Sequence, residues 1–211
     1  MGIDINRVMR RTQRYWYEDG LAEIGGGAIF LLIGLLFYAD TLAARQWGLT
    51  GLSGLGLPPV IIGGSWLGRR VVGALKMRLT YPRTGYVAYR RVRSRRLLRG
   101  AIAGAVSGLV AAALMACGAA PRAWIPALQG LFISAFFLYF GHTLGLGRFH
   151  VLAVFSVLAG GVAAVSGLGD LVGSAAYFGA LGLALILSGA LTLRAYLAAT
   201  TPLPEDGDHG G

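Results

Sequence analysis

Six stretches of this 211-residue chain hold about twenty residues each with almost no charge. They lie at residues 21–39, 49–67, 100–120, 123–141, 151–168 and 171–193. A helix needs about 20 apolar residues to cross a bilayer. Soluble domains usually contain about a quarter charged residues, whereas only 13% of this chain is charged. The sequence therefore predicts an all-α, polytopic membrane protein with six transmembrane helices, and it excludes a soluble enzyme domain.

The six stretches differ in how clearly they predict a span. The stretch at 100–120 is the clearest, because its 21 residues include no charged side chain. The stretch at 49–67 is the weakest, since it is rich in glycine and contains Pro58 and Pro59. Such a segment forms either a complete span or a broken or re-entrant one.

The basic residues predict the orientation of the chain in the membrane. Seventeen of the 19 lysines and arginines lie before the first stretch, between the second and third, between the fourth and fifth, or after the sixth. Only Arg45 and Arg122 fall in connections on the opposite side. Cytoplasmic loops carry the excess of basic residues, so we expect both termini to be cytoplasmic.

This orientation divides the chain into five parts. We expect an interfacial amphipathic helix at 1–20, two spans in 21–67, a basic cytoplasmic loop at 68–99, four spans in 100–193 and a flexible acidic tail at 194–211. The N-terminal helix is predicted from its helical periodicity, which places arginines on one side and apolar residues on the other. The first part of the loop, residues 69–79, is expected to continue the second helix.

The arginines are the predicted contacts with anionic lipid headgroups or with a protein partner, because most of them flank apolar segments. A loop tied at both ends to a bilayer is a poor reader of nucleic acid, so we expect no nucleic-acid partner. The arginines concerned are Arg7, Arg10, Arg11, Arg14, Arg69, Arg70, Arg90, Arg91, Arg93, Arg95 and Arg96.

Small residues recur every four positions along the stretch at 100–120, as Gly100, Gly104, Gly108 and Ala112. A face of small side chains lets helix backbones approach closely within a membrane. We therefore expect this helix at the centre of the bundle or at a subunit interface. The stretch at 151–168 has a shorter version of the pattern.

Glu23 is the ionisable residue that most needs an explanation, because it lies inside the first predicted span. Intramembrane charges are costly and usually paired or functional. We expect Glu23 to pair at the cytoplasmic edge with Arg69 or Arg70, or with arginines in 96–99. The alternative is an ion or proton site.

No other polar pattern indicates catalysis, a cofactor or a metal. His142 and His150 are eight residues apart, with no neighbouring cysteine or carboxylate, so we predict no metal site. Ser107 and Ser166 stand in Ala-Val-Ser-Gly, near the rhomboid protease pattern, but no later span supplies the histidine that those enzymes use. The chain is therefore not expected to be an enzyme.

Two short segments, YEDGLAEI at 17–24 and LTYPRTGYV at 79–87, resemble segments of uncharacterised bacterial multi-pass membrane proteins. The resemblance covers under a tenth of the chain and implies no activity. It implies a setting in the bacterial inner membrane.

These observations favour a non-catalytic membrane protein that acts as an interaction or regulatory component through its basic cytoplasmic face. The alternative is a small homo-oligomeric channel or transporter with Glu23 as its polar site.

Overall fold

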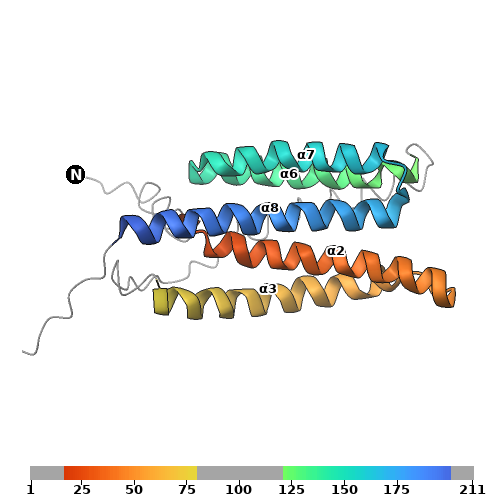
Figure 1. Ribbon diagram of the computed structural model, residues 1–211, viewed down its shortest axis with the longest axis horizontal. Coiled ribbons are helices and arrows are strands. Elements are labelled where there is room, and N and C mark those ends of the chain that lie inside the picture. The colour runs from red at the N-terminus through yellow and green to blue at the C-terminus, as the bar shows by residue number, and fades with distance from the viewer. Residues whose placement is uncertain (1–16, 80–120, 201–211) are drawn as a thin grey trace, which may run out of the picture.

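The computed structural model describes residues 17–79 and 121–200. Those two ranges contain five α-helices and no strand, which confirms the prediction of an all-α fold. The helices run up and down along one axis (Figure 1). They are α2 (Leu21–Trp47), α3 (Leu52–Leu79), α6 (Ile125–Leu144), α7 (Gly147–Val165) and α8 (Gly169–Ala199), with a 3-10 turn, η1 (Arg122–Trp124), before α6.

Four helical segments are long and apolar enough to cross a membrane, as expected of a transmembrane protein. They are Leu21–Trp47, Arg122–Leu144, Gly147–Val165 and Gly169–Ala199. α3 is not among them, because glycine, serine and proline dilute its apolar residues and its second half carries charge. The predicted span at 100–120, with its small-residue face, and residues 1–16 of the predicted amphipathic helix lie outside the described residues.

α3 is continuous despite Pro58 and Pro59, which lie inside it. Of the alternatives for the stretch at 49–67, the structure therefore contains an unbroken helix. Proline removes one backbone donor and crowds the preceding turn, but membrane helices tolerate it where neighbouring groups adjust. α3 also runs through residues 69–79, as the sequence predicts.

Several helices extend past the predicted apolar stretches. α2 continues beyond residue 39 to Trp47, α7 begins at Gly147 instead of 151, and α8 continues to Ala199. The tail predicted to start at 194 is therefore helical over its first residues. α2 stops at Gly48, whose φ of 67° places it in the left-handed region that favours glycine.

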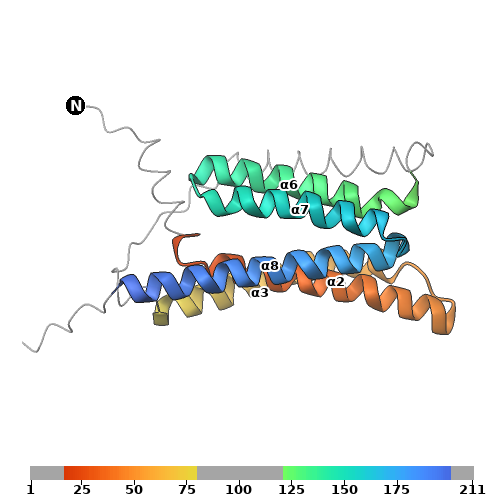
Figure 2. The same cartoon turned by 45° about the horizontal axis from the view of Figure 1, so that its top comes forward.

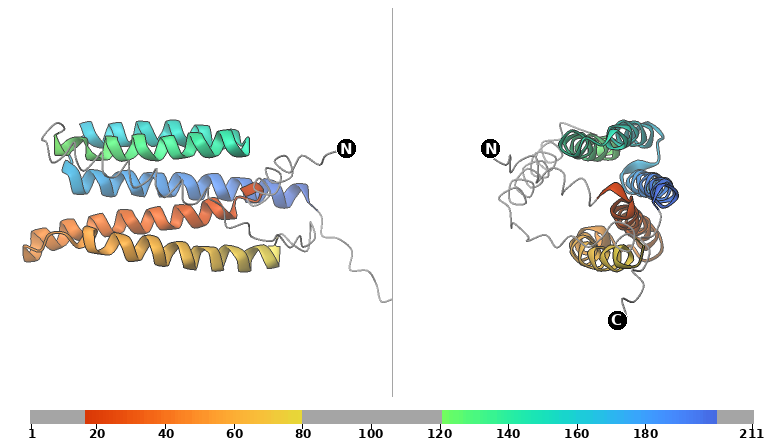
Figure 3. Two further views of the ribbon diagram at one scale, coloured as in Figure 1. Left: turned by 180° about the vertical axis from the view of Figure 1, so that it is seen from behind. Right: turned by 90° about the vertical axis from the view of Figure 1, so that its left-hand side faces the viewer.

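Viewed down the bundle axis, the helices form an arc in the order α6, α7, α8, α2, α3 (Figure 3). The most extensive contact joins α8 to α2, and α6 and α7 form a second close pair. Figure 2 shows the α6–α7 pair lying apart from the layer formed by α2, α3 and α8. The bundle thus consists of a three-helix unit and a helical hairpin, joined mainly through α7 and α8.

A seam of glycines brings α2 and α8 into close contact. A Cβ at Gly27 would lie 2.7 Å from the carbonyl oxygen of Gly182, and a Cβ at Gly189 would lie 2.6 Å from that of Gly20. Positions 20 and 27 are seven residues apart, as are 182 and 189, so the same helix face meets the partner at each step. Only the absence of side chains allows this approach.

Buried and half-buried aromatic residues pack beside the glycine seam. The ring of Phe178 on α8 stacks on Phe30 and Phe37 of α2, with centroid distances of 5.9 and 5.7 Å. Leu181 is fully buried next to them. Opposite this core, Leu35, Leu158 and Val165 have exposed side chains, which suits the lipid-facing surface of a membrane bundle.

Candidate functional site

The candidate site is a group of buried charged residues at one end of the bundle. The beginnings of α2 and α7 meet the ends of α3 and α8 there (Figure 1). We call this the polar end and define it by Asp19, Glu23, Lys76 and Arg148. These residues form two ion pairs, and each pair joins two different helices or their caps.

Glu23 and Arg148 form the first ion pair. Arg148 Nε lies 2.6 Å from Glu23 Oε1, and Ser188 Oγ donates a hydrogen bond of 2.9 Å to Glu23 Oε2. The Glu23 side chain is 2% exposed, whereas that of Arg148 is 21% exposed. The carboxylate is therefore enclosed by polar partners from α7 and α8, whereas the guanidinium remains partly accessible to solvent.

Arg148 makes two further hydrogen bonds from the start of α7. Its guanidinium donates to Thr192 Oγ1 on α8 at 2.9 Å and to the backbone carbonyl of Tyr17. The fork geometry of arginine suits such multiple recognition. This one side chain thus connects the α6–α7 hairpin to α2, to α8 and to the segment preceding α2.

Asp19 and Lys76 form the second ion pair, at 2.7 Å, and both side chains are almost fully buried. Asp19 Oδ1 also accepts a hydrogen bond of 3.2 Å from the backbone N–H of Leu21, the first residue of α2, and so satisfies one of the free donors at the start of that helix. The pair therefore ties the end of α3 to the beginning of α2.

Tyr17 lies between the two ion pairs and the α6–α7 hairpin. Its ring packs edge-on against Phe140 and Phe149, with centroid distances of 5.7 and 6.0 Å. Burial raises the pKa of the Tyr17 hydroxyl, although the nearby Arg69 acts in the opposite direction. The phenol therefore stays neutral at physiological pH and acts as a packing residue.

Asp40 is a third buried carboxylate, at the opposite end of the bundle. It accepts hydrogen bonds from the backbone N–H groups of Gly51, Leu52 and Ser53 and one of 2.5 Å from the Ser53 hydroxyl. Gly51 directly precedes α3 and Leu52 and Ser53 begin it, so Asp40, two turns before the end of α2, satisfies the free backbone donors at the start of α3. Its contacts account for its burial without a ligand.

The predicted residues divide into three groups. Glu23 pairs with an arginine, as predicted, but the partner is Arg148 and not Arg69, Arg70 or a residue in 96–99. Arg69 and Arg70 are exposed on α3. The remaining predicted arginine contacts, and Gly100, Gly104, Gly108 and Ala112, lie outside the described residues.

Sequence reasoning missed Arg148, Lys76, Ser188 and Thr192 as members of the polar end. Arg148 could have been found from the sequence, because it is the only arginine or lysine in the short connection between two apolar stretches. Lys76 is the only lysine in the chain. The two hydroxyl residues carry no such signal, since serine and threonine are ordinary in membrane helices.

A shallow groove runs along one side of α3, with a volume of about 610 Å³. It is lined by Ile61, Ile62, Ser65, Trp66, Arg69 and Arg70. The Arg70 guanidinium lies 4.4 Å from the centre of the Trp66 ring, which is a cation–π contact. Within the described ranges, no group of three or more His, Cys, Asp or Glu side chains could hold a metal.

The polar end keeps charges buried and ties helices together, while Arg69, Arg70, Arg78 and Arg194 have exposed side chains. Comparisons of the chain with protein-family models, with curated proteins and with solved structures find no match.

Proposed function

We propose that this protein is a non-catalytic integral membrane protein of the bacterial inner membrane. It acts as an interaction or regulatory component through a basic cytoplasmic face, with both termini on that side. The partners are anionic lipid headgroups and a protein that docks on the same face. The support is the distribution of charge at the polar end.

The observation that carries this proposal is the contrast between buried and exposed charges. The buried carboxylates Asp19 and Glu23 are each paired with a cation from another helix. Four further arginines on α3 and α8 near the same end are exposed, namely Arg69, Arg70, Arg78 and Arg194. Asp19 and Glu23 are thus neutralised inside the bundle, and the described surface of this end, with four exposed arginines and the exposed Glu18, is net positive, which favours anionic partners.

We also infer that the chain has six spans. α3 ends at the polar end, whereas η1 and α6 begin at the opposite end (Figure 1). The chain between Leu79 and Arg122 must therefore cover the length of the bundle. The uncharged stretch at 100–120 is long enough for this, since 21 residues of helix span about 31 Å. With α3 as the second span, the total is six.

A second candidate function is a small homo-oligomeric channel or transporter that uses Glu23. The observation in its favour is a carboxylate buried within a spanning helix beside Ser188, since such residues often mark ion or proton paths. The contact with Arg148 argues against it, because a paired carboxylate is not available to a passing cation.

Flux measurements in proteoliposomes separate the two functions. The wild-type protein and Glu23→Gln would be reconstituted at equal density, and proton and potassium flux would be followed with internal dyes. We expect no flux that depends on Glu23. Flux that is present in the wild type and lost in a folded Glu23→Gln protein would replace the proposed function with the transporter.

The interaction role is tested by purification in native nanodiscs from the producing cell. A bound protein supports the proposal if it is lost from the Arg69→Gln/Arg78→Gln variant and retained by Arg45→Gln/Arg122→Gln. The second pair removes the same charge from the opposite end of the bundle. Equal retention in both variants would show that the basic face is not the docking surface.

A further inference from the structure

The groove on α3 changes in polarity along the helix. Its lining residues form two adjacent rows with a spacing of four, one of Ile61, Ser65 and Arg69 and the other of Ile62, Trp66 and Arg70. Residues four apart lie above one another on a helix face. Each row therefore passes from an aliphatic residue, through an interfacial one, to an arginine.

We propose that this groove binds one anionic phospholipid, with the phosphate at Arg69 and Arg70 and an acyl chain along Ile61 and Ile62. The inference rests on the proposed orientation, in which the polar end faces the cytoplasm. It adds to that proposal a defined lipid site in place of a general attraction to headgroups.

The depth of the groove in the membrane fits this occupant. Arg70 lies 18 residues after the start of α3 at Leu52, or about 27 Å along the helix, close to the roughly 30 Å of a hydrocarbon core. Ile62 is eight residues earlier, about 12 Å deeper. The arginines thus lie at the level of phosphates and the isoleucines at the level of acyl chains.

The side chains in the groove are arranged to accept a phosphate. Trp66 is 59% exposed, and its ring holds the Arg70 guanidinium by a cation–π contact. A guanidinium held over an aromatic ring can still present its N–H groups to phosphate oxygens in a bidentate contact. Tryptophan itself favours the headgroup level of a membrane.

The apolar half of the groove favours a lipid over an acidic peptide. Ile61 and Ile62 are 47% and 71% exposed, and they continue toward the exposed side chains of Leu55 and Leu52. A peptide at this depth would bring unpaired backbone groups into the hydrocarbon region, which costs several kcal/mol for each group. An acyl chain has no such groups.

The test is native mass spectrometry of the delipidated full-length protein, titrated with dioleoyl phosphatidylglycerol or dioleoyl phosphatidylcholine. We expect one phosphatidylglycerol to bind more tightly than phosphatidylcholine. Arg70→Gln and Arg69→Gln should each weaken phosphatidylglycerol binding about fivefold, since an arginine near an anionic surface contributes about 1 kcal/mol. Neither should alter phosphatidylcholine binding.

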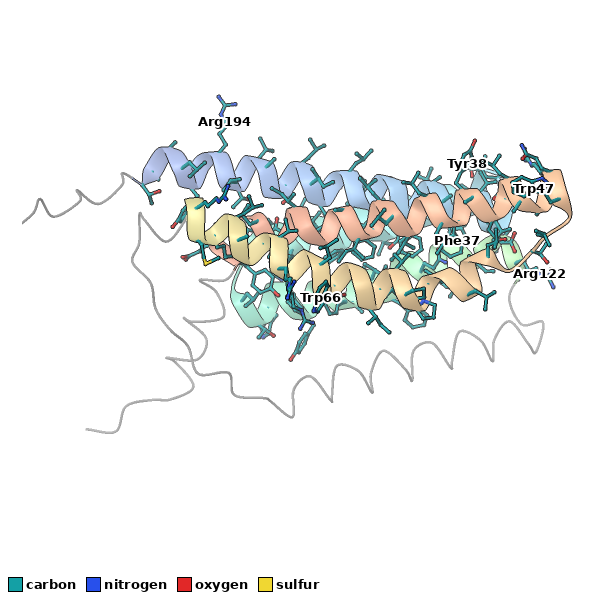
Figure 4. The ribbon with its side chains drawn as sticks, turned by 90° about the horizontal axis from the view of Figure 1, so that it is seen from below. Phe37, Tyr38, Trp47, Trp66, Arg122 and Arg194 are labelled. Carbon is teal, nitrogen blue, oxygen red and sulfur yellow. The ribbon has the colours of Figure 1, made fainter. Side chains whose placement is uncertain are left out.

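Arg194→Gln is the matched control, because it removes one exposed arginine at the same end of the bundle without touching the groove. Figure 4 shows Arg194 pointing outward from α8, on the side of the layer opposite to Trp66. This variant should bind phosphatidylglycerol like the wild type. An equal loss in Arg194→Gln and Arg70→Gln would mean a diffuse charge effect and would overturn the proposal.

A second measurement uses fluorescence from Trp66 alone, with Trp16, Trp47 and Trp124 replaced by phenylalanine. Lipid brominated on the acyl chain should quench Trp66 more strongly as phosphatidylglycerol than as phosphatidylcholine, and Arg70→Gln should remove the difference. Equal quenching by both lipids, or displacement of the lipid by free glycerophosphoglycerol at equal concentration, would exclude the site.

A glutamate-rich peptide that binds more tightly than phosphatidylglycerol, with the same dependence on Arg70, would assign the groove to a protein partner instead. The outcome is separable from the flux test above. Glu23-dependent flux leaves the lipid preference unchanged, and loss of the lipid preference leaves flux unchanged.

Discussion

At the scale of single residues, Arg148 and Glu23 contribute unequally to stability although they form one ion pair. Replacing Arg148 by Gln leaves a carboxylate that is 2% exposed with Ser188 as its remaining polar contact. An uncompensated buried charge costs about 3–5 kcal/mol. We therefore expect Arg148→Gln to lower the free energy of unfolding by about 3 kcal/mol, measured by SDS titration in mixed micelles.

Glu23→Gln should cost less, about 1 kcal/mol, because its amide oxygen still accepts from Ser188. Arg148 is then unpaired, but it is partly exposed and keeps its contacts with Thr192 and the Tyr17 carbonyl. The double variant should be more stable than Arg148→Gln alone, since it no longer buries a charge. Equal and additive losses for the two single variants would contradict the buried pair.

Asp40 gives a second prediction at this scale. Asp40→Ala leaves the N–H groups of Gly51, Leu52 and Ser53 without their acceptor, so we expect a loss of about 2 kcal/mol by the same titration. Asp40→Asn keeps one oxygen and should lose about half as much. Ser53→Ala removes one hydroxyl contact and is the control. A loss in Ser53→Ala as large as in Asp40→Ala would exclude the capping role.

The sequence predicts the chemical type of the Glu23 contact but not its partner. An acid inside an apolar stretch needs a cation, and a position near the stretch end limits the choice to one side of the membrane. Several arginines satisfy those conditions. Only the three-dimensional arrangement of the helices, in which the Arg148 side chain from the first turn of α7 reaches Glu23 at the polar end, selects Arg148 over Arg69 or Arg70.

At the scale of elements, the α2–α8 contact depends on the glycine seam. A Cβ at Gly27 would lie 2.7 Å from the Gly182 carbonyl oxygen and 2.8 Å from the Ile186 side chain, so the backbones must separate. We expect Gly27→Ala to lower the free energy of unfolding by about 1–3 kcal/mol. Thermal unfolding in detergent would measure it.

Gly26 is the control, because a Cβ there meets nothing within 4 Å. Gly26→Ala should be neutral or stabilising by up to about 1 kcal/mol, since alanine has the higher helix propensity. If both alanine variants unfold at the same temperature, the close approach of α2 and α8 does not contribute to stability.

Sequence patterns predicted the helices well and their pairing poorly. Apolar length alone locates α2, α6, α7 and α8, because a span needs about 20 apolar residues. The same criterion understates the helix ends, since α2 continues past Asp40 and Arg45 to Trp47, and α8 continues past Arg194 to Ala199. The seam at Gly20, Gly27, Gly182 and Gly189 was not predicted, because its glycines are distributed between two helices at opposite ends of the chain.

At the scale of the whole molecule, the orientation predicts which sites an impermeant reagent reaches. In a Cys117→Ser background, Gln46→Cys and Ala123→Cys lie beside Arg45 and Arg122, and we expect a membrane-impermeant maleimide to label both in intact cells. Ala88→Cys, in the basic loop, should react only after the cells are opened. Trp47 and Arg122 lie at the same end of the bundle, away from Arg194 (Figure 4).

Labelling of Ala88→Cys in intact cells would mean that the basic loop lies outside the cell, which is the opposite of the predicted orientation. A cysteine added after residue 200 tests the number of spans by the same method. This cysteine should be protected in intact cells if both termini are cytoplasmic. Its labelling from outside would mean an odd number of spans, and α3 would then be the segment that does not cross the membrane.

The distance along the chain between Glu23 and Arg148 also determines how long Glu23 lacks its partner during synthesis. Glu23 enters the membrane with the first span, but its partner follows roughly 125 residues later, which is roughly 6–25 s at about 5–20 residues per second. During that interval α2 lacks both its cation and the glycine face of α8. α2 is made before the other described helices but completes its packing among the last, and a ribosome that stalls before α7 leaves behind a chain whose α2 carries an uncompensated acid.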